Sequence, residues 1–244
     1  MTLPLVSCIL ATRNRRLFLQ QAMKYFLRQT YANKELIIVD DSQASAAALV
    51  PDDAAITYIK LDAHMTLGSK LNLGIGESYG QIVQKLDDDD YYHPDFLRTT
   101  VTALLGRDPA RVIVGLDCFL VLIAATGELK WSGHGWCAGG TLCFFRGFWE
   151  QSPFRDVPRA VDWWFLHDHP SVHVNICNPE LYILVRHRAG HLWTMLKGLD
   201  VTDYFARRPA YRKTLVDCLS IEDQEFYRRL KRIAPGIVAE EASL

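Results

Sequence analysis

Four consecutive aspartates, Asp87 to Asp90, are the residues of this sequence with the clearest capacity for chemistry. They directly follow an apolar, strand-like segment, residues 81–86. Adjacent carboxylates repel one another and a cation relieves that repulsion. Ligand sets made only of oxygen favour Mg²⁺, Mn²⁺ or Ca²⁺ over zinc. The run therefore predicts a metal site, and the simpler alternative is a solvated acidic turn before Pro94, although four acids are more than a helix cap needs.

Two other polar segments follow apolar strand-like segments in the same way. Residues 11–15 contain Arg13 and Arg15, and residues 40–42 read Asp-Asp-Ser. In an open parallel sheet, ligands bind beyond the carboxyl ends of the strands. We therefore expect the three polar segments to converge and form an anion site beside a metal site. Asp and Ser are also common turn formers, so the 40–42 segment has a purely structural alternative.

The elements that must position these segments can be predicted from apolar spacing. The first half alternates short apolar runs with helical spacing, predicting strands at 5–10, 35–39, 56–59 and 81–86 and helices at 15–29 and 70–78. Such alternation predicts an α/β fold with a mainly parallel sheet and helices on both faces. The second half is less regular, with strands predicted within 111–125, 141–145 and 181–186, a short helix at 162–169, and a final helix capped by Ser220.

Composition excludes several classes of protein. The 244 residues are 49% hydrophobic and 23% charged, which is ordinary for a globular chain, and the formal net charge of −1 gives no general attraction to nucleic acid. We find no apolar run long enough to span a membrane and no signal peptide. Six cysteines without a Cys-x-x-Cys pair predict reduced, mostly buried thiols in a cytoplasmic protein, rather than a disulfide set or a zinc site.

Several sequence blocks, in order, resemble the inverting glycosyltransferases of family 2. They are residues 6–15 and 28–42, then 67–75 and 86–94 with the Asp-x-Asp motif, then 139–165. The resemblance covers roughly residues 3–192 and implies the GT-A fold, a Rossmann-like nucleotide-binding sheet joined to a smaller acceptor-binding part. It implies a GT-A domain at 1–195, with a nucleotide-binding half at 1–105 and an acceptor-binding half at 106–195, and a helical C-terminal extension at 196–244.

The resemblance also implies roles for individual residues. It implies contacts with the nucleotide-sugar donor by Ala11, Thr12, Arg15, Asp41, Lys70, Asp87 and Asp88. Among these, Asp41 would accept a hydrogen bond from the ring N–H of uracil or thymine. Asp89 would coordinate Mn²⁺ or Mg²⁺ together with His187, and Asp162 would be the catalytic base.

The sequence departs from the family pattern in two places, and alternatives stay open there. Val161 stands where an acid usually precedes the base. His191 is an alternative metal ligand to His187, which could instead be a structural histidine. Asp168 becomes the alternative base if Asp162 only caps its helix.

The function predicted from these residues is metal-dependent, inverting transfer of a hexosyl-type sugar. The donor would be a nucleoside-diphosphate sugar, with UDP favoured over dTDP, and the acceptor a hydroxyl of a glycan, a lipid-linked intermediate or a protein. The first alternative is a catalytically inactive nucleotide-sugar or metal-binding module. A nucleotidyltransferase would need a glycine-rich loop where residues 12–15 have no glycine. A calcium-binding domain would bind metal without nucleotide.

The second half supplies aromatic and basic residues for the acceptor side. Aromatic candidates for sugar contact or for core packing are Trp131, His134, Trp136, Trp163 and Trp164. Basic residues of the tail are Arg207, Arg208, Arg212, Lys213, Arg228, Arg229, Lys231 and Arg232. The default interpretation of this tail is a set of solvated helix faces. The alternative is peripheral contact with an anionic membrane at its cytoplasmic inner face, or with a partner enzyme.

Overall fold

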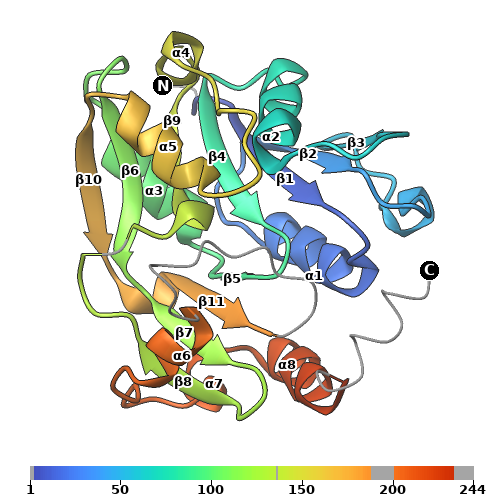
Figure 1. Ribbon diagram of the computed structural model, residues 1–244, viewed down its shortest axis with the longest axis vertical. Helices are drawn as coiled ribbons and strands as arrows, with labels where there is room; N and C mark the ends of the chain where they lie inside the picture. Colours follow the sequence, from blue (N-terminus) through green and yellow to red (C-terminus); the bar gives the residue numbers. More distant parts are fainter. Residues whose placement is uncertain (1–2, 136, 188–200, 234–244) are drawn as a thin grey trace.

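The computed structural model describes residues 3–135, 137–187 and 201–233 (Figure 1). Its centre is a seven-stranded sheet in the order β10-β6-β9-β4-β1-β2-β3. The strands are β1 (Val6–Thr12), β2 (Lys34–Asp40), β3 (Ile56–Lys60), β4 (Ile82–Asp87), β6 (Val112–Cys118), β9 (Cys143–Phe145) and β10 (Val172–Cys177). All pairs are parallel except those of β9, which runs antiparallel between β4 and β6. The prediction of a mostly parallel α/β sheet is confirmed.

Helices cover both faces of this sheet, because alternate residues of its strands are buried on opposite sides. Cys8 and Leu10 belong to the core shared with α1 (Arg16–Leu27) and α3 (Phe96–Leu104). Ile9, between them, belongs to the core on the other face, which includes residues of α2 (Leu67–Gly76), α4 (Arg146–Gln151) and α5 (Val161–Asp168). The sheet is therefore buried on both faces, which explains why its strands appear as continuous apolar runs in the sequence.

A smaller four-stranded sheet lies beside the first, in the order β5-β11-β7-β8 (Figure 1). Its strands are β5 (Tyr91–Tyr92), β7 (Leu120–Ile123), β8 (Glu128–Trp131) and β11 (Tyr182–Arg186). Besides the turn from β4 to β5, two stretches of chain pass from the large sheet into the small one, from β6 to β7 and from β10 to β11 by way of the short helix η3 (Pro179–Leu181). Because β6 and β10 are paired, these two crossings lie side by side.

Some elements differ from those expected. The segment predicted as a strand at 141–145 is divided between the short helix η2 (Gly139–Thr141) and β9. Thr141 causes this division, since its hydroxyl donates to the carbonyl of Ala138 at 2.7 Å and accepts from the amide of Leu116 at 3.0 Å. Strand β10 had no clear apolar pattern because it is an edge strand whose residues are largely exposed.

Short helices complete the described chain. They are η1 (Ala47–Leu49), α6 (Val201–Ala206), α7 (Leu215–Cys218) and the longer α8 (Ile221–Ile233). Within the described ranges, no helix combines the length and the apolar character that a membrane span requires.

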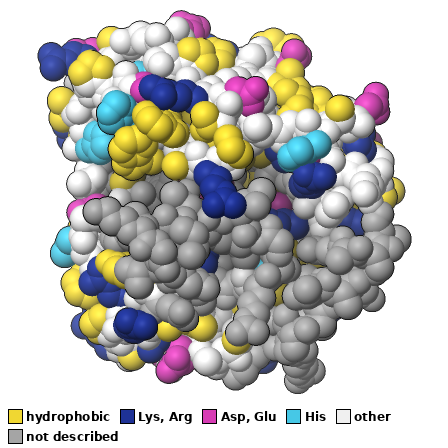
Figure 2. Space-filling model, in the orientation of Figure 1, with side chains coloured by type: hydrophobic (Ala, Val, Ile, Leu, Met, Phe, Trp, Pro, Cys, Tyr) yellow, Lys and Arg dark blue, Asp and Glu magenta, His cyan; other side chains and the backbone are white. Residues whose placement is uncertain are grey.

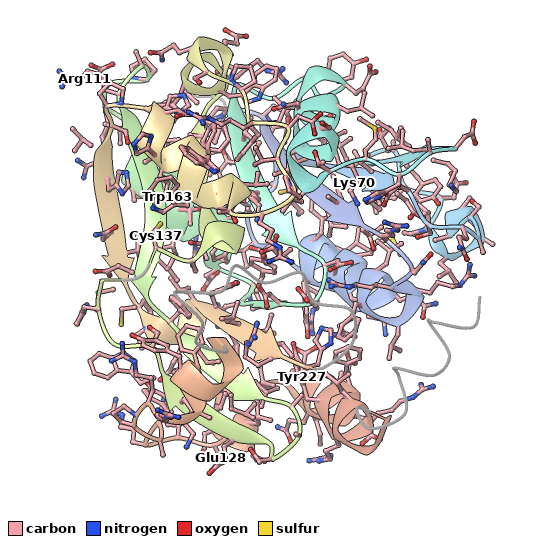
Figure 3. The ribbon with its side chains drawn as sticks, in the orientation of Figure 1. Lys70, Arg111, Glu128, Cys137, Trp163 and Tyr227 are labelled. Carbon is pink, nitrogen blue, oxygen red and sulfur yellow. The ribbon has the colours of Figure 1, made fainter. Side chains whose placement is uncertain are left out.

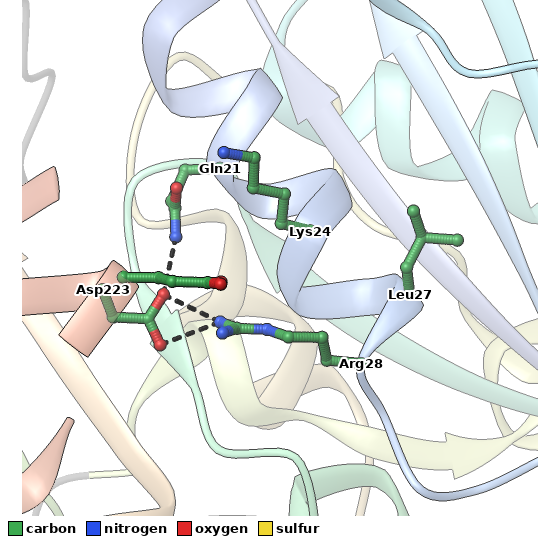
Figure 4. A pocket seen from close by; sticks show the side chains of 6 residues that line it. Gln21, Lys24, Leu27, Arg28 and Asp223 are labelled. Atoms are coloured by element: carbon green, nitrogen blue, oxygen red, sulfur yellow. Dashed lines mark hydrogen bonds and ion pairs between the residues drawn. The ribbon is translucent and has the colours of Figure 1, made fainter. Parts of the chain in front are cut away.

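The C-terminal helix α8 is held against α1 by a buried carboxylate (Figure 4). Asp223 accepts two hydrogen bonds from Arg28, at 2.8 and 2.9 Å, and a third from Gln21 at 2.9 Å. Its side chain is 3% exposed, and that of Arg28 is 31% exposed. The hydroxyl of Ser220 accepts the amide of Asp223 at 3.3 Å, so the predicted N-cap is confirmed.

Aromatic side chains continue this contact between α8 and α1. Tyr25 and Tyr227 share a hydrogen bond between their hydroxyls at 2.9 Å. The ring of Phe226 on α8 meets the ring of Phe18 on α1 edge-on, with 6.1 Å between centroids. Phe18 is almost completely buried, so α8 supports the part of α1 that faces the two sheets.

Replacing Asp223 tests how strongly this contact stabilises the fold. Asp223→Ala removes four hydrogen bonds, including one from the hydroxyl of Ser220, and leaves the partly buried Arg28 without its carboxylate, so we expect the free energy of unfolding to fall by about 2–3 kcal/mol. Urea denaturation followed by circular dichroism measures this change. Glu222→Ala, at an exposed acid one residue earlier, is the matched control. Equal effects of the two substitutions would contradict a special role for Asp223.

Candidate active site

The three polar segments meet at the carboxyl ends of β1, β2 and β4. Ala11 pairs with Asp87 across β1 and β4, and Thr12 pairs with Asp40 across β1 and β2. The hydroxyl of Thr12 donates to Oδ2 of Asp88 at 2.7 Å. The turn after β4 therefore lies directly against the end of β1, as the parallel pairing requires.

Arg15 balances the charge of two aspartates in this turn. Its Nη1 lies 2.8 Å from Oδ1 of Asp88 and 3.1 Å from Oδ2 of Asp89. Burial raises the pKa of Asp88, and the charge of Arg15 with the Thr12 hydrogen bond partly offsets that rise. The arrangement places a guanidinium and two carboxylates at one point of the sheet edge.

His187 reaches the same point from the small sheet. It directly follows β11, and its Nε2 lies 3.1 Å from Oδ2 of Asp89. The ring is fully buried and stacks on Phe18 of α1, with 4.3 Å between centroids. Asp89 and His187 thus converge from two sheets, and the aromatic stack fixes the orientation of the imidazole. The alternative ligand His191 lies outside the described residues.

Asp41 is held by a second group of basic side chains. Its Oδ1 accepts from Nζ of Lys70 at 2.7 Å, and its Oδ2 contacts Nδ1 of His64 at 2.6 Å and accepts from the amide of Met65 at 3.0 Å. Burial alone would raise the pKa of Asp41, but these hydrogen bonds together hold it below its usual value. Lys70 extends from α2 and also donates to the carbonyl of Thr12 at 3.0 Å (Figure 3).

A buried lysine joins the aspartate turn to Asp162. Nζ of Lys85, on β4, donates to Oδ1 of Asp87 at 2.6 Å and lies 3.4 Å from Oδ1 of Asp162. The lysine side chain is 2% exposed, and the two carboxylates raise its pKa despite burial. Desolvation by the surrounding protein, with a smaller contribution from Asp162, raises the pKa of Asp87 to about 6 against the opposing effect of Lys85, although 31% of the Asp87 side chain stays exposed.

Two glycines make room for these carboxylates. A Cβ atom at Gly139 would collide with the carboxylate of Asp162, and one at Gly140 would lie 2.7 Å from Oδ2 of Asp87. Asp162 is the second residue of α5, and no side-chain cap hydrogen bond forms at the start of that helix. Its carboxylate is therefore directed toward η2 and Lys85, and the interpretation of Asp162 as a simple helix cap is not supported by the geometry.

The remaining candidates on α5 lie elsewhere. Val161, at the position where an acid was expected, is buried in the core with Phe144 and Phe165. Asp168 forms two hydrogen bonds of 2.6 Å with the exposed Arg155. It sits at the last position of α5, whereas Asp162 sits in the first turn.

The last aspartate of the run ties the two sheets together. Asp90 accepts a hydrogen bond from the hydroxyl of Tyr182 and another from the amide of Val185 at 2.8 Å, both on β11. Burial, with the neighbouring aspartates, raises the pKa of Asp90 well above its usual value. Asp88, Asp89 and Asp90 are all buried, so the interpretation of the run as a solvated turn is wrong.

Sequence reasoning missed several members of this site. Lys85 was counted as part of an apolar strand, and only the ion pairs with Asp87 and the distant Asp162 reveal its place. His64 and Phe18 carried no motif. Arg15, which contacts the aspartate run, was indicated in the sequence only by the basic character of residues 13–15.

Hydrophobic side chains gather on the viewed face over α5 (Figure 2). Trp163 is 55% exposed and stacks on His167, with 4.9 Å between ring centroids. Trp164 is half-buried beneath the guanidinium of Arg155, which lies 4.0 Å from the ring centroid. Trp136 lies outside the described residues, as do the side chains of Lys231 and Arg232.

Sequence comparison matches residues 7–120 to the model of the family described as glycosyl transferase family 2. A protein of Escherichia coli (strain K12), provisionally named colanic acid biosynthesis glycosyl transferase WcaA, is 36% identical over 99 residues. These residues are 38% of this chain and 36% of that relative's length. The family match includes β2, β3, β4 and the aspartate turn, and the similarity to this relative spans about a third of the relative's length.

Solved structures of low sequence identity share the fold. The mannosyltransferase PcManGT of Pyrobaculum calidifontis, in complex with GDP-Man and Mn²⁺, superposes with a TM-score of 0.60 at 18% identity over 76% of this chain and 57% of its own. Residues 1–349 of S. aureus TarS, in complex with UDP-GlcNAc, superpose with a TM-score of 0.62 at 13% identity over 98% of this chain and 71% of its own. This chain has the GT-A fold, and its residues 7–120, a little under half of its length, are similar to glycosyl transferase family 2.

Proposed function

We propose that this protein transfers a sugar, with inversion, from a nucleoside-diphosphate sugar to an acceptor hydroxyl, with a divalent cation bound at the donor site. The observation that carries this proposal is the charge arrangement along the sheet edge. Asp89 and His187 converge at one end, and Asp162 stands at the other, joined through Lys85 and Asp87. A sugar transferase needs this pairing, because the leaving diphosphate needs positive charge and the acceptor needs a base.

The donor would lie across β1, β2 and the aspartate turn. Asp41 accepts three contacts from Lys70, His64 and Met65, yet an ionised carboxylate has about four acceptor sites, which leaves capacity for the ring N–H of a uracil. The end of β1, at Ala11 and Thr12, would contact the nucleoside.

The rest of the aspartate turn would face the ribose and the diphosphate. Asp87 and Asp88 would accept hydrogen bonds from the hydroxyl groups of the ribose. Arg15, 2.8 Å from Asp88, would attract the diphosphate. Lys70, beside Asp41, adds a second positive charge near the nucleotide.

Asp89 and His187 would hold the cation. A carboxylate oxygen and an imidazole nitrogen 3.1 Å apart, with carboxylates on either side, form a donor set that suits Mn²⁺ or Mg²⁺. When bound, the cation neutralises charge on the diphosphate. The stack of His187 on Phe18 keeps the imidazole in place for this task. The presence of Mn²⁺ with GDP-Man in the structurally similar mannosyltransferase supports the use of a divalent cation.

Asp162 would remove the proton from the acceptor hydroxyl as the sugar is transferred. Lys85, buried and 3.4 Å from Oδ1 of Asp162, keeps this carboxylate directed toward the sheet edge, where it would act as the base. Attack from the side opposite the diphosphate in a single displacement inverts the anomeric carbon. The exposed Trp163 next to Asp162 offers an aromatic face to a glycan, lipid-linked or protein-borne sugar acceptor.

A second candidate function is a nucleotide-sugar binding module without catalysis. Its supporting observation is Val161, since the acid expected beside the base is replaced by a residue buried in the apolar core. The two candidates differ in turnover but not in donor binding.

Calorimetric titration of UDP tests the donor site. We expect UDP to bind more tightly with Mn²⁺ than without it, and dTDP and GDP to bind more weakly. Asp89→Ala should remove the dependence on Mn²⁺, because it deletes one of the two cation ligands. Asp95→Ala, at a partly exposed acid just before α3, is the control and should leave binding unchanged. Absence of binding by all three nucleotides would contradict the proposal.

Turnover of an Asp162→Asn variant tests the base. We expect kcat to fall by about 10²–10⁴-fold, since the amide cannot take a proton, while the affinity for UDP stays unchanged. The readout is UDP release with the best donor and acceptor found in a screen. Asp168→Asn tests the alternative base and should retain most activity. A wild-type protein that binds donor but shows no turnover with any acceptor would favour the binding module.

A further inference from the structure

Two cysteines and a histidine from distant parts of the sequence meet away from the donor site. The ligand atoms of Cys118, His134 and Cys177 all lie within 4.8 Å of one another. Cys118 ends β6 and Cys177 ends β10, and the two residues are partners across these strands after a shift of register between Ile176 and Cys177. His134 follows β8, in the segment that leads toward Gly139. The cluster thus stands where both chain crossings leave the large sheet.

Neighbouring side chains support these three groups. The indole N–H of Trp131 donates to Sγ of Cys118 at 3.3 Å, a contact that fixes the position of that sulfur. The edge of the same indole meets the His134 ring, with 5.5 Å between centroids. Oδ2 of Asp117 lies 3.5 Å from Nδ1 of His134. Cys118 is buried, whereas Cys177 and His134 are exposed, so an ion from solvent can reach the cluster.

We propose that Cys118, His134 and Cys177 form a binding site for Zn²⁺. Two sulfurs and an imidazole nitrogen are ligands that zinc prefers, and they differ from the oxygen-rich surroundings of Asp89. A tetrahedral zinc holds two sulfurs about 3.8 Å apart, so the donors need to approach by about 1 Å at most. Binding releases the two thiol protons to solvent, and water fills the fourth position. Asp117 takes the outer position that orients a zinc-bound histidine.

This site would fasten the two sheets together. It would join the ends of β6 and β10 to the segment carrying His134, in which Gly133 and Gly135 have positive φ angles of 75° and 91°. That segment continues to Gly139, against which Asp162 rests. Zinc would therefore stabilise the segment between His134 and Gly139, on the proposed acceptor side, without contacting the donor.

Cobalt spectroscopy of the reduced full chain tests the proposal. Co²⁺ should bind with a thiolate-to-cobalt charge-transfer band that saturates at one equivalent, and Zn²⁺ should displace it. Cys177→Ser and His134→Ala should each weaken Zn²⁺ binding at this site by at least about 100-fold, because loss of an outer partner alone costs about 10- to 100-fold. Trp131→Phe should weaken it by about 10-fold and keep the band.

Control variants separate this site from other features. Cys218→Ser changes a cysteine of α7 that is outside the cluster and should leave the band unchanged. Asp89→Ala should also leave it unchanged, which separates the site from the donor cation. Thermal unfolding without metal should be similar for wild type and Cys177→Ser, since Cys177 is exposed. Absence of the band in the wild type, its persistence in Cys177→Ser, or formation of a Cys118–Cys177 disulfide in place of metal uptake would overturn the proposal.

Discussion

The architecture of the site depends on one constraint: four adjacent carboxylates are placed at the edge of a sheet, and three of them are buried. Each has at least one polar partner. Asp87 contacts Lys85, and Asp88 contacts Thr12 and Arg15. Asp89 contacts Arg15 and His187. Asp90 accepts hydrogen bonds from the hydroxyl of Tyr182 and the amide of Val185. These partners come from both sheets and from the start of α1. Without these partners the four carboxylates would repel one another. The turn is therefore stable only when both sheets are present and correctly placed.

The part of the fold that carries the three polar segments could be predicted from the sequence for a simple physical reason. Strands buried on both faces are apolar at every position, and the polar residues that follow them are forced to one edge. Ile9 and Leu10 face different cores, yet both belong to the same apolar run. The place of Lys85 could not be predicted from the sequence pattern. Its burial depends on two carboxylates, one from the turn after its own strand and one from α5. The cysteine cluster was equally hidden, and the expectation against a zinc site considered only spacing along the chain.

The part of the fold around Asp162 could be predicted less fully. The family match ends at residue 120, before η2, β9 and α5, so the segment that carries Asp162 had to be placed by structure. There, Val161 joins the apolar core and Asp162 alone turns toward the sheet edge. The charge partner of this carboxylate is the buried lysine of β4. One strand therefore supplies both the aspartate turn and the cation that faces Asp162.

The packing of α8 on α1 connects the end of the described chain to the sheet edge through a series of side-chain contacts. Phe226 of α8 supports Phe18, Phe18 supports the imidazole of His187, and His187 meets Asp89. Helix α8, which carries none of the motifs, thus supports the aspartate turn from outside through this chain of contacts. A shortened chain that stops before Ile221 would keep every charged group described at that edge and still lose the support behind its histidine.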